Sequence, residues 1–212
     1  MFKNSNLLEI KHEIAKISNE VEIVAVSKNH PKEDVVKAIK AGVKTYGENR
    51  VQEAEVKFRD LKKTFHNIEL HMTGPLQTNK VKLALEFFDV FQTLDRPKLL
   101  KEFCKNLNLS KTKKFFVQIN TGNEKNKSGV TTSYANDFIK ECKDRLGKSI
   151  VGLMCIPPID QNPKDHFDYL FNLSESHGLK NLSMGMSSDY LVAVKCGATH
   201  VRIGTKLFGN RL

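Results

Sequence analysis

The stretch VEIVAVSK, at Val21–Lys28, is a short run of β-branched and small apolar residues that ends in a lysine. Five of the seven residues before that lysine are Val, Ile or Ala, which predicts a strand buried on both faces, as in a parallel sheet. Because an ammonium group is costly to bury, Lys28 either reaches solvent along its aliphatic stem or has a function at the end of this strand. Taken alone, the segment favours the solvent-exposed alternative.

Strand-like and helix-like segments alternate on the C-terminal side of this stretch. Residues 5–19, which precede it, place apolar side chains at helical spacing and predict a lead-in amphipathic helix. After it, a helix is expected to open at Pro31 and to end at Gly42. Further strands are predicted at 43–47, 69–73, 90–94, 115–120, 150–156, 182–186 and 200–203, and further helices at 50–63, 77–88, 97–106, 133–146, 163–177 and 187–196, with a final turn at 206–209.

This alternation counts eight strands with helices between successive pairs. Strict alternation implies a parallel sheet with right-handed crossovers, and eight such units close into a (β/α)8 TIM barrel. The 212 residues are few for that fold, so its loops must be short. We therefore predict an α/β fold with a single barrel domain over 1–212; the alternative is an open doubly wound sheet, although eight units exceed what that usually needs.

Composition limits the classes of protein to which the chain can belong. No apolar run approaches membrane-spanning length, and the N-terminal MFKNSNLLEI lacks the apolar stretch of a secretory signal. The cysteines are scattered without a C-x-x-C pair, so we expect reduced thiols in a cytoplasmic protein and neither a disulfide framework nor a metal site; they are Cys104, Cys142, Cys155 and Cys196.

The formal charge of +10 raises the possibility of nucleic-acid binding. The lysines, however, are spread over helix ends and loops, and the chain has no arginine-rich tract and no RNA-binding signature with stacking aromatics. A solvated lysine-rich surface with weak, non-specific attraction for polyanions is the favoured interpretation.

Polar residues at the ends of the last two strands predict a phosphate site. In a barrel, phosphates often bind after strands seven and eight, where this chain has Ser187 and then Gly204-Thr205. Strand eight pairs with strand one in a closed barrel, so Lys28 is expected beside Arg202 and this site. A lysine, an arginine and a phosphate cradle form an arrangement suited to pyridoxal 5′-phosphate (PLP). The alternatives are a helix cap at Ser187, a plain turn at 204–205 and a rim salt bridge for Arg202.

Seven blocks, in order along nearly the whole chain, carry a family resemblance. They are AVSK (25–28), YGENRVQE (46–53), HMTGPLQTNK (71–80), NEKNKSG (123–129), GLMCIPP (152–158), LSMGMSSD (182–189) and VRIGTKLFG (201–209). With these blocks, the chain resembles the pyridoxal phosphate homeostasis protein family, also called the YggS or PROSC type. That family's fold is similar to the barrel domain of alanine racemase, which agrees with the eight predicted strands.

The resemblance implies a role for each of six residues. Lys28 is implied to form the Schiff base with PLP, Asn49 to line the pocket near the ring, and Arg202 to face the pyridine nitrogen. The phosphate-binding positions are implied to be Ser187, Gly204 and Thr205. Four further residues fall in family blocks without an assigned role: His71, Gln77, Asn79 and Lys80. Lys127 either receives the cofactor transiently or is simply solvated, and solvation is favoured.

The same resemblance indicates a carrier of PLP with no catalytic residues of its own. An arginine opposite the pyridine nitrogen disfavours protonation of the ring, which makes the ring a poorer electron sink. Alanine racemase takes much of its site, including a tyrosine, from a second domain, whereas this sequence ends at Leu212 and places no tyrosine at a matching position; Tyr46 is expected to be a packed strand residue. We expect a monomeric PLP-homeostasis protein that supplies apo PLP-dependent enzymes. The alternative is a PLP-dependent amino-acid racemase or a related PLP enzyme.

Overall fold

The apolar run at Val21–Lys28 forms β1 (Glu22–Val26), which lies between β2 (Thr45–Glu48) and β9 (His200–Ile203) in the computed structural model. The structure describes residues 1–110 and 112–209. β1 and β9 are parallel over four residue pairs, from Glu22 beside His200 to Ala25 beside Ile203. The first and last strands of the chain are therefore direct neighbours, as the sequence predicted.

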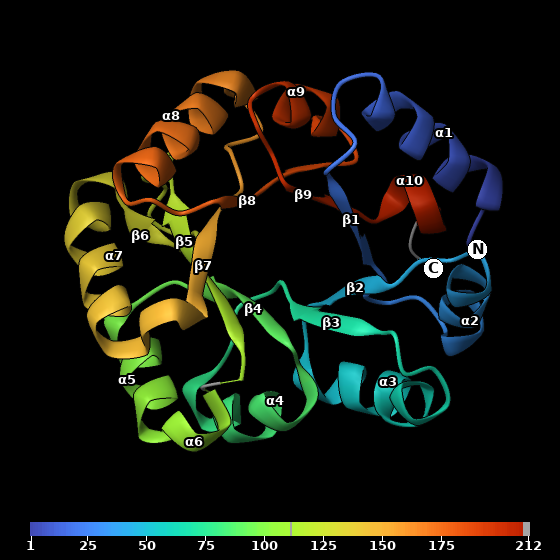
Figure 1. Ribbon diagram of the computed structural model, residues 1–212, viewed down its shortest axis with the longest axis horizontal. Helices are drawn as coiled ribbons and strands as arrows, with labels where there is room; N and C mark the ends of the chain where they lie inside the picture. The colour runs from blue at the N-terminus through green and yellow to red at the C-terminus, as the bar shows by residue number, and fades with distance from the viewer. Residues whose placement is uncertain (111, 210–212) are drawn as a thin grey trace.

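The pairing of β1 with β9 closes a barrel (Figure 1). Around the ring, β2 pairs with β3 (Glu69–Met72), and the order continues through β4 (Val90–Leu94), β5 (Lys114–Asn120), β7 (Ile150–Cys155) and β8 (Asn181–Met186) back to β9. In the part of the chain that the structure describes, these eight strands are all parallel. The predicted (β/α)8 barrel is confirmed, and the open doubly wound sheet is excluded.

Helices form a ring outside the strands (Figure 1). The longer helices turn an apolar face inward; in α5, for example, Leu99, Leu100 and Phe103 are fully buried. The longer helices are α1 (Asn4–Ala15), α2 (Lys32–Lys40), α3 (Val51–Thr64), α4 (Val81–Phe87), α5 (Pro97–Lys105), α7 (Thr132–Leu146), α8 (Pro163–Ser176) and α9 (Tyr190–Lys195). Short helical turns are α6 (Leu107–Ser110), α10 (Thr205–Phe208), η1 (Thr78–Lys80) and η2 (Gly147–Ser149).

Several element boundaries differ from the prediction, two of them beside the predicted site, and one short strand was not predicted. β1 ends at Val26, so Lys28 lies in a turn beyond the strand, and Asn29 takes a left-handed conformation with φ of 61°. The helix predicted from 187 begins at Tyr190, because the Asp189 carboxylate accepts the Met186 N–H at 2.6 Å and closes a turn before it. A two-residue strand, β6 (Val130–Thr131), pairs with β5 and is too short to give a sequence pattern.

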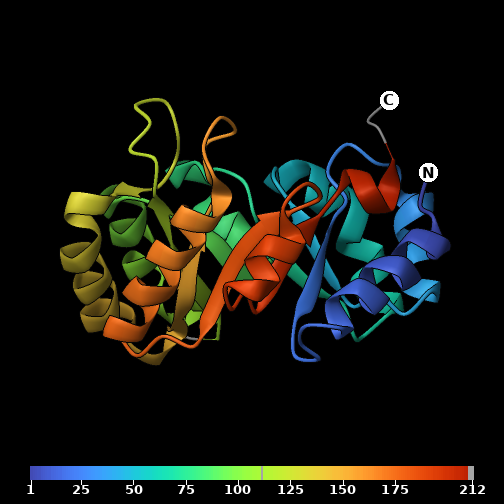
Figure 2. The same ribbon diagram turned by 90° about the horizontal axis from the view of Figure 1, so that it is seen from above.

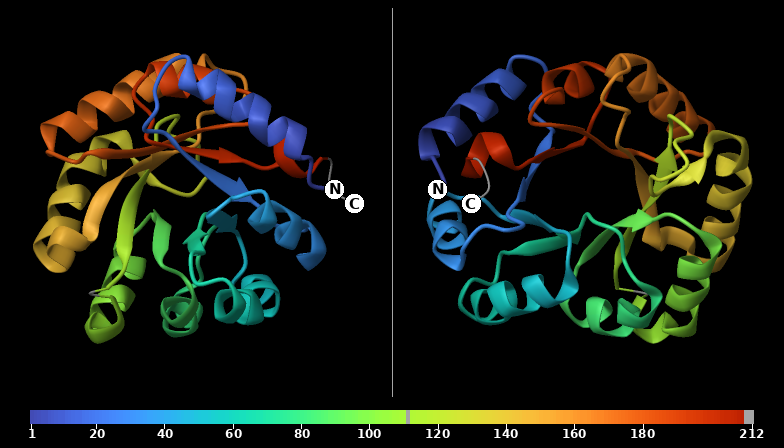
Figure 3. Two further views of the ribbon diagram at one scale, coloured as in Figure 1. Left: turned by 45° about the vertical axis from the view of Figure 1, so that its right-hand side comes forward. Right: turned by 180° about the vertical axis from the view of Figure 1, so that it is seen from behind.

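The N-terminal helix α1 lies against α10, and the two ends of the described chain meet on one side of the barrel (Figure 3). The Met1 amine donates to the Phe208 carbonyl at 2.6 Å, and the Asn6 side-chain amide donates to the Lys206 carbonyl at 2.7 Å. The predicted lead-in helix therefore packs on the segment that follows the last strand.

The carboxyl ends of the strands, where the site was predicted, share one end of the barrel. In the side view, the loops after β5 and β7 rise from the same end as α10 (Figure 2). Within the residues described, none of the helices combines the length and the apolar composition needed to cross a bilayer.

Candidate functional site

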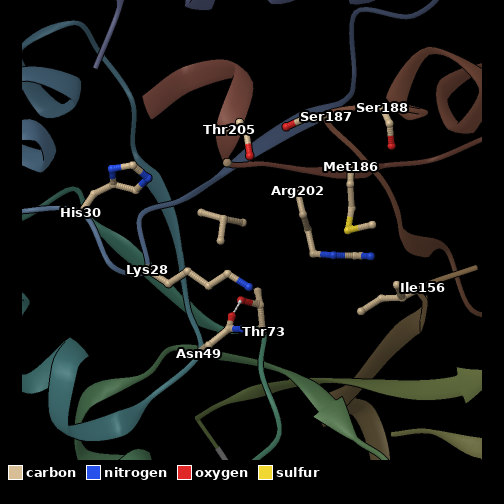
Figure 4. Close-up of a pocket in the computed structure, with 12 residues that line it drawn as sticks. Lys28, His30, Asn49, Thr73, Ile156, Met186, Ser187, Ser188, Arg202 and Thr205 are labelled. Carbon is tan, nitrogen blue, oxygen red and sulfur yellow. Dashed lines mark hydrogen bonds between the residues drawn. The ribbon is translucent and has the colours of Figure 1, made fainter. Parts of the chain in front are cut away.

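A cavity of about 360 Å³ opens at the carboxyl end of the barrel, and all six residues predicted for the site line it (Figure 4). They are Lys28, Asn49, Ser187, Arg202, Gly204 and Thr205, and the other lining residues are Val26, His30, Thr73, Ile156, Met186 and Ser188. The volume falls in the range of roughly 300–1,000 Å³ typical of small-molecule pockets. The walls come from residues far apart in sequence, because closure of the barrel brings β1, β8 and β9 together.

The backbone before Lys28 is held by a buried polar cluster of three side chains. The Lys57 ammonium donates to the carbonyl of Ser27 at 2.7 Å and to the Glu48 carboxylate at 2.8 Å. The Ser27 hydroxyl donates to the same carboxylate oxygen at 2.6 Å. Burial raises the pKa of Glu48, and the neighbouring Lys57 opposes that rise. The cluster therefore fixes Ser27, the residue that precedes Lys28.

The backbone after Lys28 is held as well. The Asn29 N–H donates to the Glu53 carboxylate at 2.5 Å, and Glu53 also accepts from the Lys57 ammonium at 3.1 Å. The pKa of Glu53 is lowered, because these hydrogen bonds and the positive charge of Lys57 outweigh the opposing effect of burial. One helix, α3, thus supplies the side chains that fix the turn on both sides of Lys28.

Asn49 follows β2 and faces the pocket beside Thr73, which follows β3 (Figure 4). The Thr73 hydroxyl donates to the Asn49 side-chain oxygen at 3.0 Å, which leaves the Asn49 amide N–H group as a donor for a ligand. Gly74 permits this approach, because a Cβ at that position would lie 2.6 Å from the Cβ of Asn49. Gly74, which follows the third predicted strand, is therefore needed to make room for Asn49.

Arg202 enters the pocket from β9 and is almost completely buried, with 5% of its surface exposed. Its guanidinium donates to the Ser183 hydroxyl at 2.6 Å and to the Cys155 carbonyl at 2.7 Å. Burial lowers the pKa of Arg202, but an arginine keeps its charge at any physiological pH. The predicted alternative, a salt bridge on the barrel rim, is wrong, since both of these partners are neutral acceptors inside the barrel.

A chain of hydrogen bonds continues from Arg202 across the barrel interior. The Ser183 hydroxyl donates to the Gln92 side-chain oxygen at 2.6 Å, and the Gln92 amide nitrogen lies 2.8 Å from His71 Nδ1. His71 Nε2 in turn lies 2.8 Å from the Glu69 carboxylate, near the opposite end of the barrel. His71 thus stabilises the interior and does not line the pocket.

Hydroxyl groups and a glycine form the pocket wall at the ends of β8 and β9. Ser187 and Thr205 both face this side of the pocket, next to Gly204 (Figure 4). Ser187 does not cap a helix, since α9 begins three residues later with Asp189 at its N-cap. The Ser187 hydroxyl instead accepts the Lys206 N–H at 3.4 Å, which ties the two segments together.

Comparison with known proteins identifies the family. The family model described as alanine racemase, N-terminal domain, matches residues 5–211. A protein named pyridoxal phosphate homeostasis protein, from Haemophilus influenzae, is 35% identical over 224 residues, covering 98% of this chain and 94% of its own length. The chain belongs to the pyridoxal phosphate homeostasis protein family.

Solved structures agree with this membership. PipY from Synechococcus elongatus PCC7942 has been solved without PLP, with a TM-score of 0.87, 31% identity and coverage of 97% of this chain and 99% of that one. The same protein has been solved with PLP bound, with a TM-score of 0.82, 29% identity and the same coverage. Alanine racemase from Acinetobacter baumannii shares the barrel alone, at 16% identity and a TM-score of 0.77, and the chain spans 62% of it.

Several pocket residues of this family member were not singled out from the sequence. Thr73 and Ile156 are the last residues of the predicted strands 69–73 and 150–156, so the rule that barrel sites lie at strand ends would have found them. Met186 and Ser188 flank Ser187 in a block that the resemblance already covered. His30, which stacks on Phe208 at 5.1 Å between ring centroids, comes from a turn with no such signal.

The residues of the family blocks without an assigned role lie outside this pocket. Gln77 and Lys80 line a neighbouring cavity, whereas the side chain of Asn79 is exposed. Lys127 is exposed in the loop after β5, as expected for a solvated lysine. Tyr46 is fully buried and donates to the Val43 carbonyl at 3.1 Å, which confirms it as a packed strand residue.

Among the described residues, no cysteine side chain lines this pocket. All four cysteines are free thiols, as the sequence predicted, and burial raises the pKa of Cys155 to about 12. Within residues 1–110 and 112–209, no group of three or more His, Cys, Asp or Glu side chains is placed to hold a metal ion.

Proposed function

We propose that this protein binds PLP in the pocket at the carboxyl end of the barrel and holds it as a Schiff base on Lys28. The observation that carries the proposal is the convergence of an amine, a buried guanidinium and two hydroxyls on one cavity of about 360 Å³. Relatives named for PLP homeostasis, and the PipY structure with PLP bound, support the same conclusion. The bond forms when the neutral Lys28 amine condenses with the cofactor aldehyde and releases one water.

The residues present fit each part of such a cofactor. For a phosphate group, Ser187 and Thr205 supply hydroxyl donors, and Gly204 has no side chain that would shield the backbone. Arg202 supplies a fixed cation for the ring nitrogen, and the amide of Asn49 supplies a donor on the side of β2 and β3. Val26, Ile156 and Met186 add apolar surface that a ring can contact.

The role of Arg202 supports a carrier without turnover. When bound, PLP supplies an electron sink, and the strength of that sink depends on protonation of its ring nitrogen. A permanently charged guanidinium held by Ser183 and Cys155 disfavours a second positive charge beside it. The tyrosines, a possible source of a second acid or base, lie outside the pocket: Tyr46, Tyr134, Tyr169 and Tyr190.

A reversible covalent bond suits a protein that keeps PLP sequestered and then releases it. The recipients that fit this chemistry are apo PLP-dependent enzymes, and the free thiols suit a cytoplasmic location. We further propose that the protein acts as a monomer and as one PLP-binding barrel over 1–212.

The decisive experiment follows the absorbance of the PLP-loaded protein. We expect a visible band that borohydride abolishes while fixing the cofactor on the peptide that contains Lys28. In Lys28→Ala both the band and the trapping should be lost. Lys127→Ala, which removes an exposed lysine from a loop at the same end of the barrel, should keep both. Trapping on any other lysine, or an unchanged spectrum in Lys28→Ala, would contradict the assignment.

Turnover is tested separately by incubating the PLP-loaded protein with a panel of L-amino acids in deuterium oxide. We expect no exchange of the α-proton beyond that caused by free PLP at the same concentration. Robust exchange that disappears in Lys28→Ala would establish the racemase-type alternative instead.

A further inference from the structure

A second cavity, of about 640 Å³, lies beside the first at the mouth of the barrel. The two cavities share Asn49 as a wall. The second is formed by segments that follow β2, β3 and β4, whereas the first lies on the side of β1, β8 and β9. Two of the family-block residues without a role, Gln77 and Lys80, belong to it.

The charged side chains that line this cavity are all basic: Arg50, Lys80 and Arg96. They come from three different segments, so the positive charge results from the fold and not from a run in the sequence. Asp95 forms an ion pair with Arg96, and Glu53 lies near enough to Arg50 to interact with it, but neither acid lines the cavity. A net positive charge therefore faces the space.

One of these cations is fixed in place. The Arg96 guanidinium donates to the Leu76 carbonyl at 2.8 Å and is paired with Asp95, so its orientation is set before any ligand arrives. Lys80 is partly buried and Arg50 is exposed at the N-cap of α3, so both can adjust to a ligand. The side chain of Gln77 adds an amide that donates or accepts.

The floor of the cavity is apolar. Val51, Met72 and Leu76 line it, and each has at most 3% of its surface exposed. Buried apolar side chains beneath a set of cations suit a ligand that has an anionic group and an apolar body. Three cations suit a doubly charged group, and arginine matches phosphate with two parallel hydrogen bonds.

We propose that this cavity is a second binding site, separate from the Lys28 pocket, for a small organic phosphate monoester. The phosphate group contacts Arg50, Lys80 and Arg96, and the organic part rests on Met72 and Leu76. Binding here is non-covalent and requires no reaction of Lys28. Because Asn49 forms a wall of both cavities, an occupant of the second contacts the same side chain as an occupant of the first.

The test is a calorimetric titration of the full-length protein in phosphate-free buffer with phenyl phosphate. Lys80→Gln and Arg50→Gln should each weaken binding roughly tenfold or more, because each removes a charge-assisted hydrogen bond. Lys82→Gln removes an exposed lysine two positions along the same segment and should leave the affinity unchanged. Benzoate, with one negative charge, should bind more weakly than phenyl phosphate.

A parallel titration of Thr205→Val distinguishes the two cavities. If phenyl phosphate occupies the second cavity, Thr205→Val leaves its affinity unchanged, while Lys80→Gln lowers it. Loss of affinity in Thr205→Val with none in Lys80→Gln would place the ligand in the Lys28 pocket and overturn this proposal, without affecting the assignment of PLP. Absence of saturable binding, an equal loss in Lys82→Gln, or benzoate binding as tight as that of phenyl phosphate would also overturn it.

Discussion

At the carboxyl end of the barrel, polar side chains hydrogen-bond to one another and also surround a cavity, whereas those around Glu69 and His71 at the amino end only hydrogen-bond to one another. Lys28, Asn49 and Arg202 turn donor groups toward the space above the strands. At the other end, the Glu69 carboxylate accepts from Lys114 at 3.1 Å and lies 2.8 Å from His71. The two ends have similar residue types, but only at the carboxyl end do these side chains turn toward a cavity of the barrel.

Between the ends, apolar side chains and the hydrogen-bonded Ser183, Gln92 and His71 fill the barrel. Val90, Phe116 and Met154 form a small cluster separate from the main core, and Phe116 packs edge-on against His200 at 5.2 Å between ring centroids. The amino end is therefore closed by packing. This difference teaches that polar groups at the amino end stabilise the fold alone, whereas those at the carboxyl end also prepare a surface for a ligand.

The largest expected effect comes from breaking the cluster under the Lys28 turn. Lys57→Met would leave the Glu48 carboxylate buried without its cation, and removal of one partner of a buried ion pair costs about 3–5 kcal/mol. Urea denaturation should show this loss in the free energy of unfolding. Lys164→Met, which breaks the exposed pair with Asp168, is the control and should change stability little. A loss of less than about 1 kcal/mol in Lys57→Met would show that the cluster does not stabilise the carboxyl end of the barrel.

The second-largest effect is expected at the amino end of the barrel, where the free energy of unfolding should depend on pH. Burial and the nearby His71 lower the pKa of His200 to about 4. The unfolded chain, in which the pKa is near 6.5, then takes up the proton more readily than the folded chain. Stability from this residue is therefore complete above pH 6.5 and is lost as the pH falls toward 4, by roughly 3 kcal/mol.

The control for that prediction is His200→Phe, which keeps an aromatic ring against Phe116 and cannot titrate. The free energy of unfolding of the variant should fall less steeply between pH 6.5 and 4 than that of the unchanged protein. The pKa of Glu69, lowered to about 2 chiefly by its hydrogen bond to His71, adds acid sensitivity below pH 4.5 in both proteins. Parallel pH curves for the two proteins would mean that His200 does not titrate in this window.

The smallest expected effect is on the ligand and not on the fold. Thr205→Val removes one hydroxyl donor from the proposed phosphate position, which corresponds to about 1–2 kcal/mol of binding and to release of PLP roughly 5–30 times faster. Absorbance during dialysis measures this rate. Thr64→Val, on an exposed turn at the end of α3, is the matched control. Equal release rates in all three proteins would exclude contact between Thr205 and the phosphate.

The barrel and its site could be predicted because the same segments carry the signals for both. The apolar run of each strand indicates the fold, and the polar residues at its end indicate the site. Apolar runs such as Val21–Lys28 mark strands through burial, and the closing pair β1–β9 follows from counting eight of them. Closure alone then brings Lys28 next to Arg202 and Gly204. No contact between individual side chains needed to be known for that step.

What the sequence could not predict depends on side chains that meet only in three dimensions. Gln92 in VFQTL is a polar residue in an apolar strand, which signals a buried partner, but nothing in the pattern names Ser183 and His71 as that partner. Likewise the sequence alone does not distinguish Lys57 from the many surface lysines on amphipathic helices, although only 6% of its surface is exposed. The two-residue strand β6 is shorter than any periodic pattern.

The contact between α1 and α10 makes the start of the chain a part of the support of the proposed PLP pocket. Tyr190 and Lys206 both bind Glu13 of α1, and Lys206 directly follows Thr205. An affinity tag or a proteolytic cut that displaced α1 would leave all eight barrel strands in place while loosening the proposed phosphate end of the pocket. Preparations that differ only at their first dozen residues would then differ in how much cofactor they retain.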